Sequence, residues 1–577
     1  MKKVHRGLLP ICASALLLTG CIDDKYDLSD IDTDVRLQVN DLVVPINIQE
    51  TKLETIFSLK EDSKIKKING VYAFVEEGEF KSDNISINPI HIKAPTIRPT
   101  EVTINGSGQS SSPRRAPQQS FSYNIAGQST SFTAETGGIS DFIISINQAG
   151  AHFTLKIHIA IPAFDTLLKQ THIKGLQLRI PRGLTIENAS NRYDPKTGIY
   201  NFGDVDQNGC GVDLEFKVSN IDIAQANAKF DYATHHIKIS DEMAITGGQL
   251  QFTTDDLKTS DLSRIPQSFK LVTSFTMSDI DITSYTGEMK YNLEGVNISD
   301  VNITGLPDIL MNEQTDIRIA NPQIYFNVNN PLYQYNLKAT AGVSITSYDG
   351  GNKVGTYSLD KNFFTIDGKK SEANYYFSPK EVSSFFQGYQ NPEWVPYTSL
   401  SNVLSGNGIP NRLHIEFVDP KVPQQKVSNL LLGHDFGDVK GHYTFYAPLE
   451  LGAGSQIIYT DVLDGWSSED LDAVTIQKLV VRATVTTDIP ISIDFTGYPI
   501  DKQGKKINNV EIKGATVPAN ATDHPLEITI TGEINGLDGI SFEAKALPGS
   551  QNPLSPDMNI RLTNIRPMVS GYYEKEL

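Results

Sequence analysis

Residues 153–159 read Phe153-Thr154-Leu155-Lys156-Ile157-His158-Ile159, with apolar and polar side chains in strict alternation. Successive side chains of a β-strand point to opposite faces, so this alternation is typical of a strand with one buried face. The same pattern recurs in Val212–Val218, Ile324–Val328, Leu413–Phe417 and Leu526–Ile530. We therefore expect strands along most of the chain.

Turn signals separate the alternating segments. They include Asp194-Pro195-Lys196-Thr197-Gly198, Asn208-Gly209, Asp349-Gly350-Gly351 and Asp501-Lys502-Gln503-Gly504. Many short strands divided by turns predict a mostly β protein, with several antiparallel β-sandwich domains of the immunoglobulin or fibronectin kind in tandem. Short helices are expected at Glu381–Tyr389 and Thr398–Leu404.

The 577 residues are enough for roughly three or four domains. We expect an N-terminal β region over residues 37–304, formed by one large or two β-sandwich domains. The Gly/Ser/Pro-rich stretch 106–119 should be a flexible loop within it. A seam at Gly305-Leu306-Pro307 begins a middle sandwich over 305–420. Two prolines in 419–423 interrupt the strand pattern and suggest a C-terminal sandwich over 421–577.

The first twenty residues have the features of a secretory signal peptide. Lys2, Lys3 and Arg6 form a basic start, and an apolar run extends from Gly7 to Leu18. These twelve residues are too few for a membrane-spanning helix, which needs about 20. We therefore expect residues 1–20 to be removed.

Leu18-Thr19-Gly20-Cys21 ends the signal and resembles the bacterial lipobox. The resemblance implies cleavage before Cys21 and attachment of acyl chains, palmitate among them, to this cysteine. Each buried CH₂ contributes about 0.8 kcal/mol, so several acyl chains suffice to hold a protein at a membrane. Only Cys210 then remains, and a single thiol forms no internal disulfide.

An acidic tether follows over residues 21–36, poor in apolar side chains. The formal net charge of the precursor is −18, and removal of the basic signal leaves 47 basic against 68 acidic residues. Such a surface repels phosphate backbones, so nucleic acid is not an expected partner. The acidic start is similar to the export signal of surface lipoproteins of Bacteroidota, which favours surface display over a periplasm-facing position.

Several further segments resemble a group of Bacteroidota cell-envelope lipoproteins. They are Asp23–Asp32, Asp41–Ile46, Asn321–Leu332 and Tyr446–Leu449. The resemblance implies an outer-membrane location through the lipid on Cys21, and it supplies no activity. Glycans or other envelope proteins are the partners that such a location suggests.

One segment fits the spacing of a calcium-binding EF-hand loop. Asp204, Asp206 and Asn208 stand at positions 1, 3 and 5, Gly209 at position 6 and Glu215 at position 12. The alternation of Val212–Val218 instead places Glu215 on a strand, and a hairpin turn at Asn208-Gly209 explains the same residues. We favour the hairpin and keep calcium as the alternative; no other cofactor is expected.

Exposed aromatic side chains would be needed to stack on sugar rings. Trp394, Tyr397 and Trp466 lie in polar, turn-like segments and are the candidates for ligand binding. The competing interpretation is that each closes one end of a sandwich core. We favour core packing, with Trp394 and Tyr397 as the better binding candidates.

The sequence contains no H-E-x-x-H, G-x-S-x-G, P-loop or dinucleotide fingerprint. We therefore expect a non-enzymatic binding or structural role in the envelope. One alternative is a glycan-binding accessory protein of an outer-membrane uptake system. The other is an adhesin or fimbrial subunit that is cut after an arginine. In that family the cut lies close to the mature N-terminus, whereas Arg114 lies far inside this chain.

Overall fold

The computed structural model describes residues 35–43, 49–61, 63–106, 119–189, 191–310, 315–359, 364–407, 409–466, 474–548 and 552–575. Within these ranges the chain is mostly antiparallel β-sheet, which confirms the predicted fold class. The α-helix found there is α1, Leu53–Phe57. The short 3-10 helices are η2 (Pro162–Phe164), η3 (Thr254–Asp256), η4 (Leu262–Arg264), η5 (Asp308–Leu310), η6 (Tyr333–Tyr335) and η7 (Thr398–Asn402).

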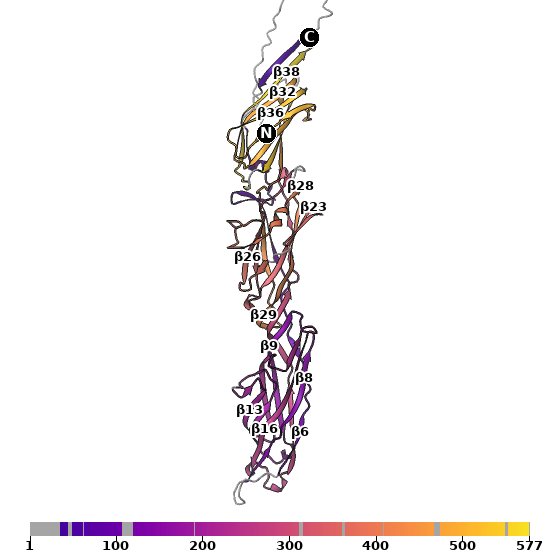
Figure 1. The fold of residues 1–577 in the computed structure, drawn as a ribbon, viewed down its shortest axis with the longest axis vertical. Helices are drawn as coiled ribbons and strands as arrows, with labels where there is room; N and C mark the ends of the chain where they lie inside the picture. The colour runs from indigo at the N-terminus through magenta and orange to yellow at the C-terminus, as the bar shows by residue number, and fades with distance from the viewer. Residues whose placement is uncertain are drawn as a thin grey trace, which may run out of the picture. The chain divides into compact units, whose positions relative to one another are not determined.

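The chain divides into two compact units, which are described separately (Figure 1). The small unit comprises residues 1–51, 458–546 and 559–577, and the large unit comprises 52–457 and 547–558. This division differs from the sequence-based boundaries at 304/305 and 420/421. Composition along the chain gives no sign that the small unit combines both chain ends. The finer boundaries stay predictions.

The small unit contains two sheets. Among the described residues, the six-stranded sheet has the order β1 (Val35–Val43), β38 (Asn559–Lys575), β32 (Thr475–Thr487), β36 (His524–Ile534), β34 (Val510–Lys513), with β2 (Gln49–Lys52) also on β38. The other sheet has the order β31 (Ile457–Leu463), β37 (Gly539–Pro548), β33 (Ile491–Ile500), β35 (Ala515–Val517). Their apolar faces share one core, which includes Trp466, Leu479, Ile528 and Val569.

The described residues of the large unit form three larger sheets. The first has the order β11 (Leu184–Ile186), β14 (Val212–Asp222), β9 (Ile143–Ala160), β18 (Ile280–Asn292), β29 (Arg412–Leu431), β23 (Ala339–Asp349), β24 (Asn352–Ser358), with β5 (Ile90–Ile92), β6 (Thr100–Asn105), β17 (Ser268–Met277), β20 (Val301–Asn302) and β25 (Phe364–Ile366) at its sides. The second has the order β12 (Tyr193–Asp194), β13 (Ile199–Asn208), β10 (Gln170–Arg179), β16 (His236–Thr253), β15 (Ala228–Asp231), with β7 (Ser120–Asn124) and β8 (Gln128–Thr136) on β16.

The third sheet has the order β19 (Asn297–Ile298), β4 (Val71–Lys81), β30 (Lys440–Pro448), β22 (Gln323–Asn329), β26 (Glu372–Ser378), β27 (Glu393–Pro396), with β3 (Ile65–Ile68) on β4. Strands β26 and β27 run parallel to each other. A separate small ladder joins β21 (Asp316–Ile317) to β28 (Gly406–Asn407).

The two most clearly alternating segments of the sequence are neighbours. Strand β14 pairs antiparallel with β9, and Ile157 lies opposite Leu214 on the buried face. The same register places Lys156 opposite Glu215 on the solvent face, with 3.2 Å between their charged atoms. Alternation and charge therefore agree on one register, because a slip of one residue would expose the apolar set.

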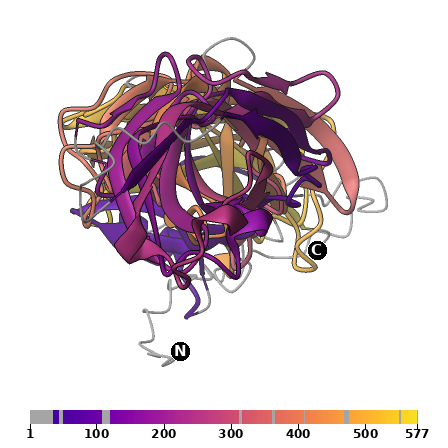
Figure 2. The same ribbon diagram turned by 90° about the horizontal axis from the view of Figure 1, so that it is seen from below.

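The first and second sheets of the large unit pack face to face. Tyr200 of β13 meets Phe216 of β14 edge to face, with 5.0 Å between the ring centroids. Figure 1 labels β8, β9, β13 and β16 in this part of the large unit, and Figure 2 views the same ribbon from below. Buried apolar side chains fill the space between them.

Strand β29 continues through the prolines that the sequence suggests as a break. Its first part pairs with β23 and its later part with β18. The register shifts beside Asp419, whose φ of 50° marks a bulge, and the carbonyl of Pro420 accepts a hydrogen bond from Leu293. The predicted interruption is therefore wrong, because a bulge absorbs the missing N–H groups.

Of the two predicted short helices, one is found in the structure and the other is not. Thr398–Leu404 contains the short 3-10 helix η7, whereas residues 381–389 form bends and turns. In this second segment Phe386 and Tyr389 pack against Tyr325 of β22. Gly388 also has a φ of 99°. Tertiary packing thus overrides the local helical pattern, and the prediction of a helix at Glu381–Tyr389 is wrong.

Candidate functional site

The residues of the calcium-loop motif lie on two strands of different sheets. Asp204, Asp206 and Asn208 are exposed on one face of β13, and Glu215 is exposed on β14. Strand β13 pairs with β10, whereas β14 pairs with β9. The strand expected at Val212–Val218 is confirmed. The hairpin at Asn208-Gly209 is wrong, because β13 and β14 are not hydrogen-bonded neighbours.

Residues 209–211 carry the chain from one sheet to the other. The Thr171 hydroxyl donates to the Gly209 carbonyl at 2.8 Å and accepts from the Gly211 N–H at 3.0 Å. Gly211 has a φ of 114°, and a Cβ there would lie 2.8 Å from the carbonyl oxygen of Ile159. The Cys210 thiol donates to the Ile161 carbonyl, and burial raises its pKa. The glycines of the motif therefore serve this crossing.

Each carboxylate of the motif already has another partner. Asp204 accepts from the Gly175 N–H at 2.9 Å and from the Lys174 ammonium at 3.1 Å, and these bonds lower the pKa of its carboxyl. Asp206 is hydrogen-bonded to His172. In the described part of the chain, no three His, Cys, Asp or Glu side chains are arranged to hold a metal ion. A calcium role for these residues stays a prediction, and we build nothing on it.

The predicted aromatic residues occupy three different environments. Trp466 is 5 % exposed within the core of the small unit. Tyr397 is 1 % exposed, and its hydroxyl donates to the Tyr357 carbonyl at 2.6 Å. Trp394 is half-buried beside Tyr376, and its indole N–H donates to the Ser378 hydroxyl at 3.0 Å. Tyr397 and Trp466 offer no free ring face to a sugar, so we do not carry them into a proposed site.

Several predicted features lie outside the described residues. They are Cys21, the signal peptide 1–20, most of the tether 21–36, most of the loop 106–119 and Arg114. Among the helices that are described, none is long and apolar enough to cross a membrane.

The structure also forms a shallow polar hollow on the outer face of the second sheet of the large unit. Its volume is about 600 Å³. We call it the polar hollow, and its lining residues are Ser131, Phe132, Thr133, Arg179, Arg182, Lys196, Thr197, Asn227, Ser240, Asp241 and Glu242. They come from β8, β16, the end of β10, the lead into β15 and two turns. Three cations, two carboxylates and several neutral hydrogen-bonding groups thus gather in one place.

Two glycines hold the rim of the polar hollow. Gly198 ends the turn 194–198, with a φ of 75°, and its N–H donates to the Asp194 carbonyl. Gly183, with a φ of 70°, packs so tightly that a Cβ would lie 2.5 Å from the backbone N of Ala226. The Gly183 N–H also donates to the Pro195 carbonyl. The two turns are therefore joined by a backbone hydrogen bond, and the close approach of Gly198 to Ile180 requires a residue without a side chain.

Only some of the charged side chains in the polar hollow form ion pairs within the protein. Asp241 accepts from the Arg182 backbone N–H at 3.0 Å, and its carboxylate lies 3.6 Å from the Arg182 guanidinium. Among the described residues, Arg179, Lys196 and Glu242 form no side-chain hydrogen bond and no ion pair within 4.0 Å, although the Lys196 ammonium is near enough to Asp194 to help lower the pKa of that carboxyl. Thr133 and Ser240 share a hydrogen bond of 3.0 Å between their hydroxyls. Two cations and one carboxylate are thus available to a ligand.

Only one part of the polar hollow had a sequence signal. The turn Asp194–Gly198 is confirmed as the connection between β12 and β13, and it carries Lys196. Nothing local indicates that Ser131, Arg179 and Glu242 approach one another. The pairing of β8 and β10 with β16 brings them together.

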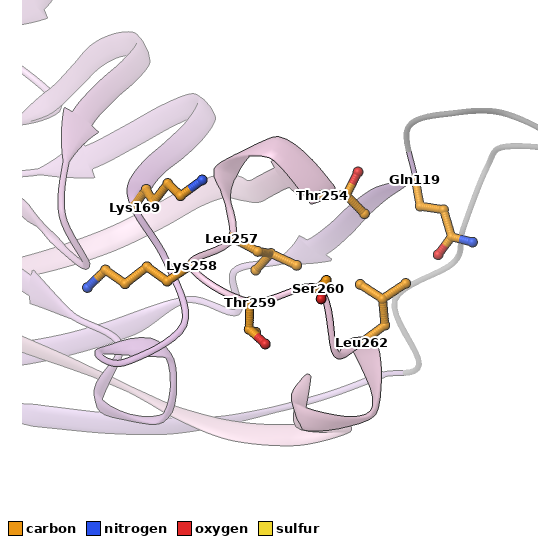
Figure 3. A pocket seen from close by; sticks show the side chains of 8 residues that line it. All are labelled: Gln119, Lys169, Thr254, Leu257, Lys258, Thr259, Ser260 and Leu262. Carbon is orange, nitrogen blue, oxygen red and sulfur yellow. The ribbon is translucent and has the colours of Figure 1, made fainter.

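A second hollow, of about 490 Å³, lies at η3 and η4 (Figure 3). Its two lysines are used within the fold: the Lys169 ammonium donates to the Asp255 carbonyl, and that of Lys258 donates to the Asp165 carbonyl. In Figure 3 the Lys258 ammonium points away from the hydroxyls of Thr259 and Ser260. The groups do not converge, so the polar hollow is the better candidate.

Comparison with known proteins yields little. No protein-family model matches the chain, and no curated protein sequence matches it. A solved structure from Parabacteroides distasonis, named as a protein inferred to be secreted, is 12% identical with a TM-score of 0.36, over 50% of this chain and 89% of that one. A triple jelly-roll protein from an archaeal virus is 7% identical with a TM-score of 0.10, over 84% and 91% of the two chains. With TM-scores this low, we infer nothing from either likeness.

Proposed function

We propose that this protein is anchored in the outer membrane through acyl chains on Cys21, faces the cell surface and has a non-enzymatic binding role. The lipobox-like Leu18-Thr19-Gly20-Cys21 and the acidic residues after it carry the proposal, and the pairing of β1 with β38 shows where the chain then enters the fold. Strand β1 begins at Val35, in the last two residues of the predicted tether, and the register runs from Val35 opposite Lys575 to Val43 opposite Met568. Residues 35–43 are therefore built into a sheet.

This pairing suggests how the two units divide the work. The chain from Cys21 enters the small unit first, and the large unit begins only at residue 52. In the six-stranded sheet β38 lies between β1 and β32. A force applied through the tether to β1 would therefore be transmitted to the sheet through the hydrogen bonds between β1 and β38. The small unit would act as the mount, and the large unit, with the polar hollow, would act as the binding module.

The anchor is tested by metabolic labelling with an alkyne fatty acid in a bacterium that processes lipoproteins. The Cys21→Ser variant should lose the label and leave the membrane fraction. The matched control, Cys210→Ser, removes a half-buried thiol of the large unit and should keep both. A labelled Cys21→Ser variant would refute lipidation at this residue.

Surface display needs a separate measurement. Protease added to intact cells should degrade the protein, while a periplasmic marker survives. Protection of the chain until the outer membrane is permeabilised would instead establish a periplasm-facing position and overturn this part of the proposal.

A further inference from the structure

We propose that the polar hollow binds an acidic saccharide, with Arg179 and Lys196 taking the carboxylate and Glu242 and Asn227 taking neighbouring hydroxyls. This inference rests on the binding role proposed above and names its ligand class. It follows from the charges that the fold leaves unpaired, the neutral groups between them and the rigidity of the rim.

Basic side chains gather in the polar hollow although the chain as a whole is acidic. The chain has 68 acidic residues and only 50 basic ones, so acidic side chains predominate overall. Three basic residues nevertheless line this one hollow. Arg182 is paired with Asp241, whereas in the described structure Arg179 forms no ion pair and Lys196 interacts with Asp194 without a direct ion pair. Guanidinium and ammonium groups bind carboxylates through charge-assisted hydrogen bonds.

The small net charge of the polar hollow limits the charge of its ligand. Asp241 and Glu242 also line the hollow, so its formal charge is only about +1 at neutral pH. A single carboxylate would neutralise this net charge, whereas a phosphate monoester, at about −1.5 to −2, would leave excess negative charge beside the Glu242 carboxylate. The charge balance therefore favours a monoanion over a phosphate.

Neutral hydroxyl and amide groups also line the polar hollow. Ser131, the hydrogen-bonded hydroxyls of Thr133 and Ser240, and the Asn227 amide add neutral donors and acceptors to the lining of the hollow. The Glu242 carboxylate can accept hydrogen bonds from hydroxyl groups of a ligand. A ligand with a carboxylate and no hydroxyl groups would leave Glu242 without a partner. A ring that bears one carboxylate and several hydroxyls, as in a uronic acid, would satisfy both sets.

The backbone that carries the two cations of the polar hollow is held in place by the fold. Lys196 stands in a turn that Gly198 closes, and the turn is bonded to the neighbouring one through the Gly183 N–H and the Pro195 carbonyl. Arg179 lies at the end of β10, in register with Ala244 of β16. The backbone at both residues is therefore fixed before a ligand binds, so that binding costs only the freedom of the side chains.

The experiment uses isothermal titration of the purified mature protein in detergent. The acidic probes are trigalacturonate and a hyaluronan tetrasaccharide, and maltotriose and inorganic phosphate are the comparisons. At least one acidic probe should bind about tenfold or more tightly than maltotriose, as expected for hydrogen bonds to charged groups. Phosphate should not displace it, and added salt should weaken it.

The test variant is Arg179→Gln with Lys196→Gln. It should lose about tenfold or more in affinity for the acidic probe, because two charged hydrogen-bond donors are replaced. The matched control, Lys217→Gln with Arg561→Gln, removes the same charges at exposed positions outside the hollow and should bind normally. Equal melting temperatures of the two double variants would show that folding is intact.

Three results would overturn the inference: binding of neither acidic probe, equal binding of maltotriose, or unchanged affinity in the test variant. Displacement by phosphate would also overturn it in favour of a general anion site. Chromatography of the recovered probe separates this inference from the proposed function. An intact probe is expected, whereas a shortened probe would refute the non-enzymatic role and leave the site standing.

Discussion

A Cβ atom on residue 198 would lie 2.4 Å from the carbonyl oxygen of Ile180, so Gly198 permits the closest approach on the rim of the polar hollow. The Ile180 N–H donates to the Gly198 carbonyl at 2.9 Å, which holds the two segments together. The position of Lys196 therefore depends on a residue that has no side chain.

Gly198→Ala should destabilise the large unit and weaken ligand binding. The αL backbone alone costs an L-residue about 1–2 kcal/mol, and the contact with Ile180 adds to this. The control is Gly70→Ala, which has a similar φ of 80° and nothing within 4 Å of the added Cβ. Urea unfolding should show the larger loss for Gly198→Ala, and equal losses would mean that the close approach is unimportant.

His172 should make the stability of the large unit depend on pH. Burial alone would lower the pKa of His172, but hydrogen bonds to Asp206 and Asp256 outweigh it and raise the pKa. A raised pKa in the folded state stabilises the protein below the unfolded value of about 6.5, and this contribution disappears as pH rises through the folded value. His172→Gln should therefore lower the melting temperature more at pH 6 than at pH 9. An equal effect at both values would contradict this ion pair.

Trp466→Ala should destabilise the small unit selectively. Truncation of a buried aromatic residue costs about 3–5 kcal/mol, and Trp466 is 5 % exposed in that core. The protein has two tryptophans, so Trp394 remains as a fluorescent probe of the large unit. Circular dichroism should show an earlier transition while the fluorescence midpoint of Trp394 stays in place. A fall of both midpoints together would mean that the units unfold as one.

Calcium should not change the stability of the protein. Asp204, Asp206 and Glu215 lie on two strands of different sheets and have Lys174, His172 and Lys156 as partners. Melting curves with calcium and with a chelator should therefore coincide. A higher melting temperature in calcium would reveal a bound ion through its linkage to folding, and would restore the EF-hand interpretation.

The joining of the chain ends can be tested by a disulfide. Gln38 and Tyr572 are paired directly across β1 and β38, so cysteines at both positions should be close enough to oxidise. The pair Gln38→Cys with Tyr573→Cys is the control, since adjacent residues of a strand point to opposite faces. Mobility on non-reducing gels reads the result, and cross-linking of the control instead would mean that the register is shifted.

The sequence by itself determined the mostly β class and the position of several strands. Alternation over Phe153–Ile159 and Val212–Val218 suffices, because side-chain direction in a strand is a local property. It likewise located the turn at Asp194–Gly198. The sequence also supports the lipid anchor at Cys21, which stays a prediction.

Only the tertiary structure decided which strands are neighbours. The pairing of β1 with β38 joins segments more than 500 residues apart, and the polar hollow joins β8, β10 and β16. Similar alternating segments can pair in many ways, since any apolar face can cover another. The choice depends on packing of the whole core, on tight crossings such as Gly211 and on tertiary contacts such as those of Tyr389, none of which is encoded in a local pattern.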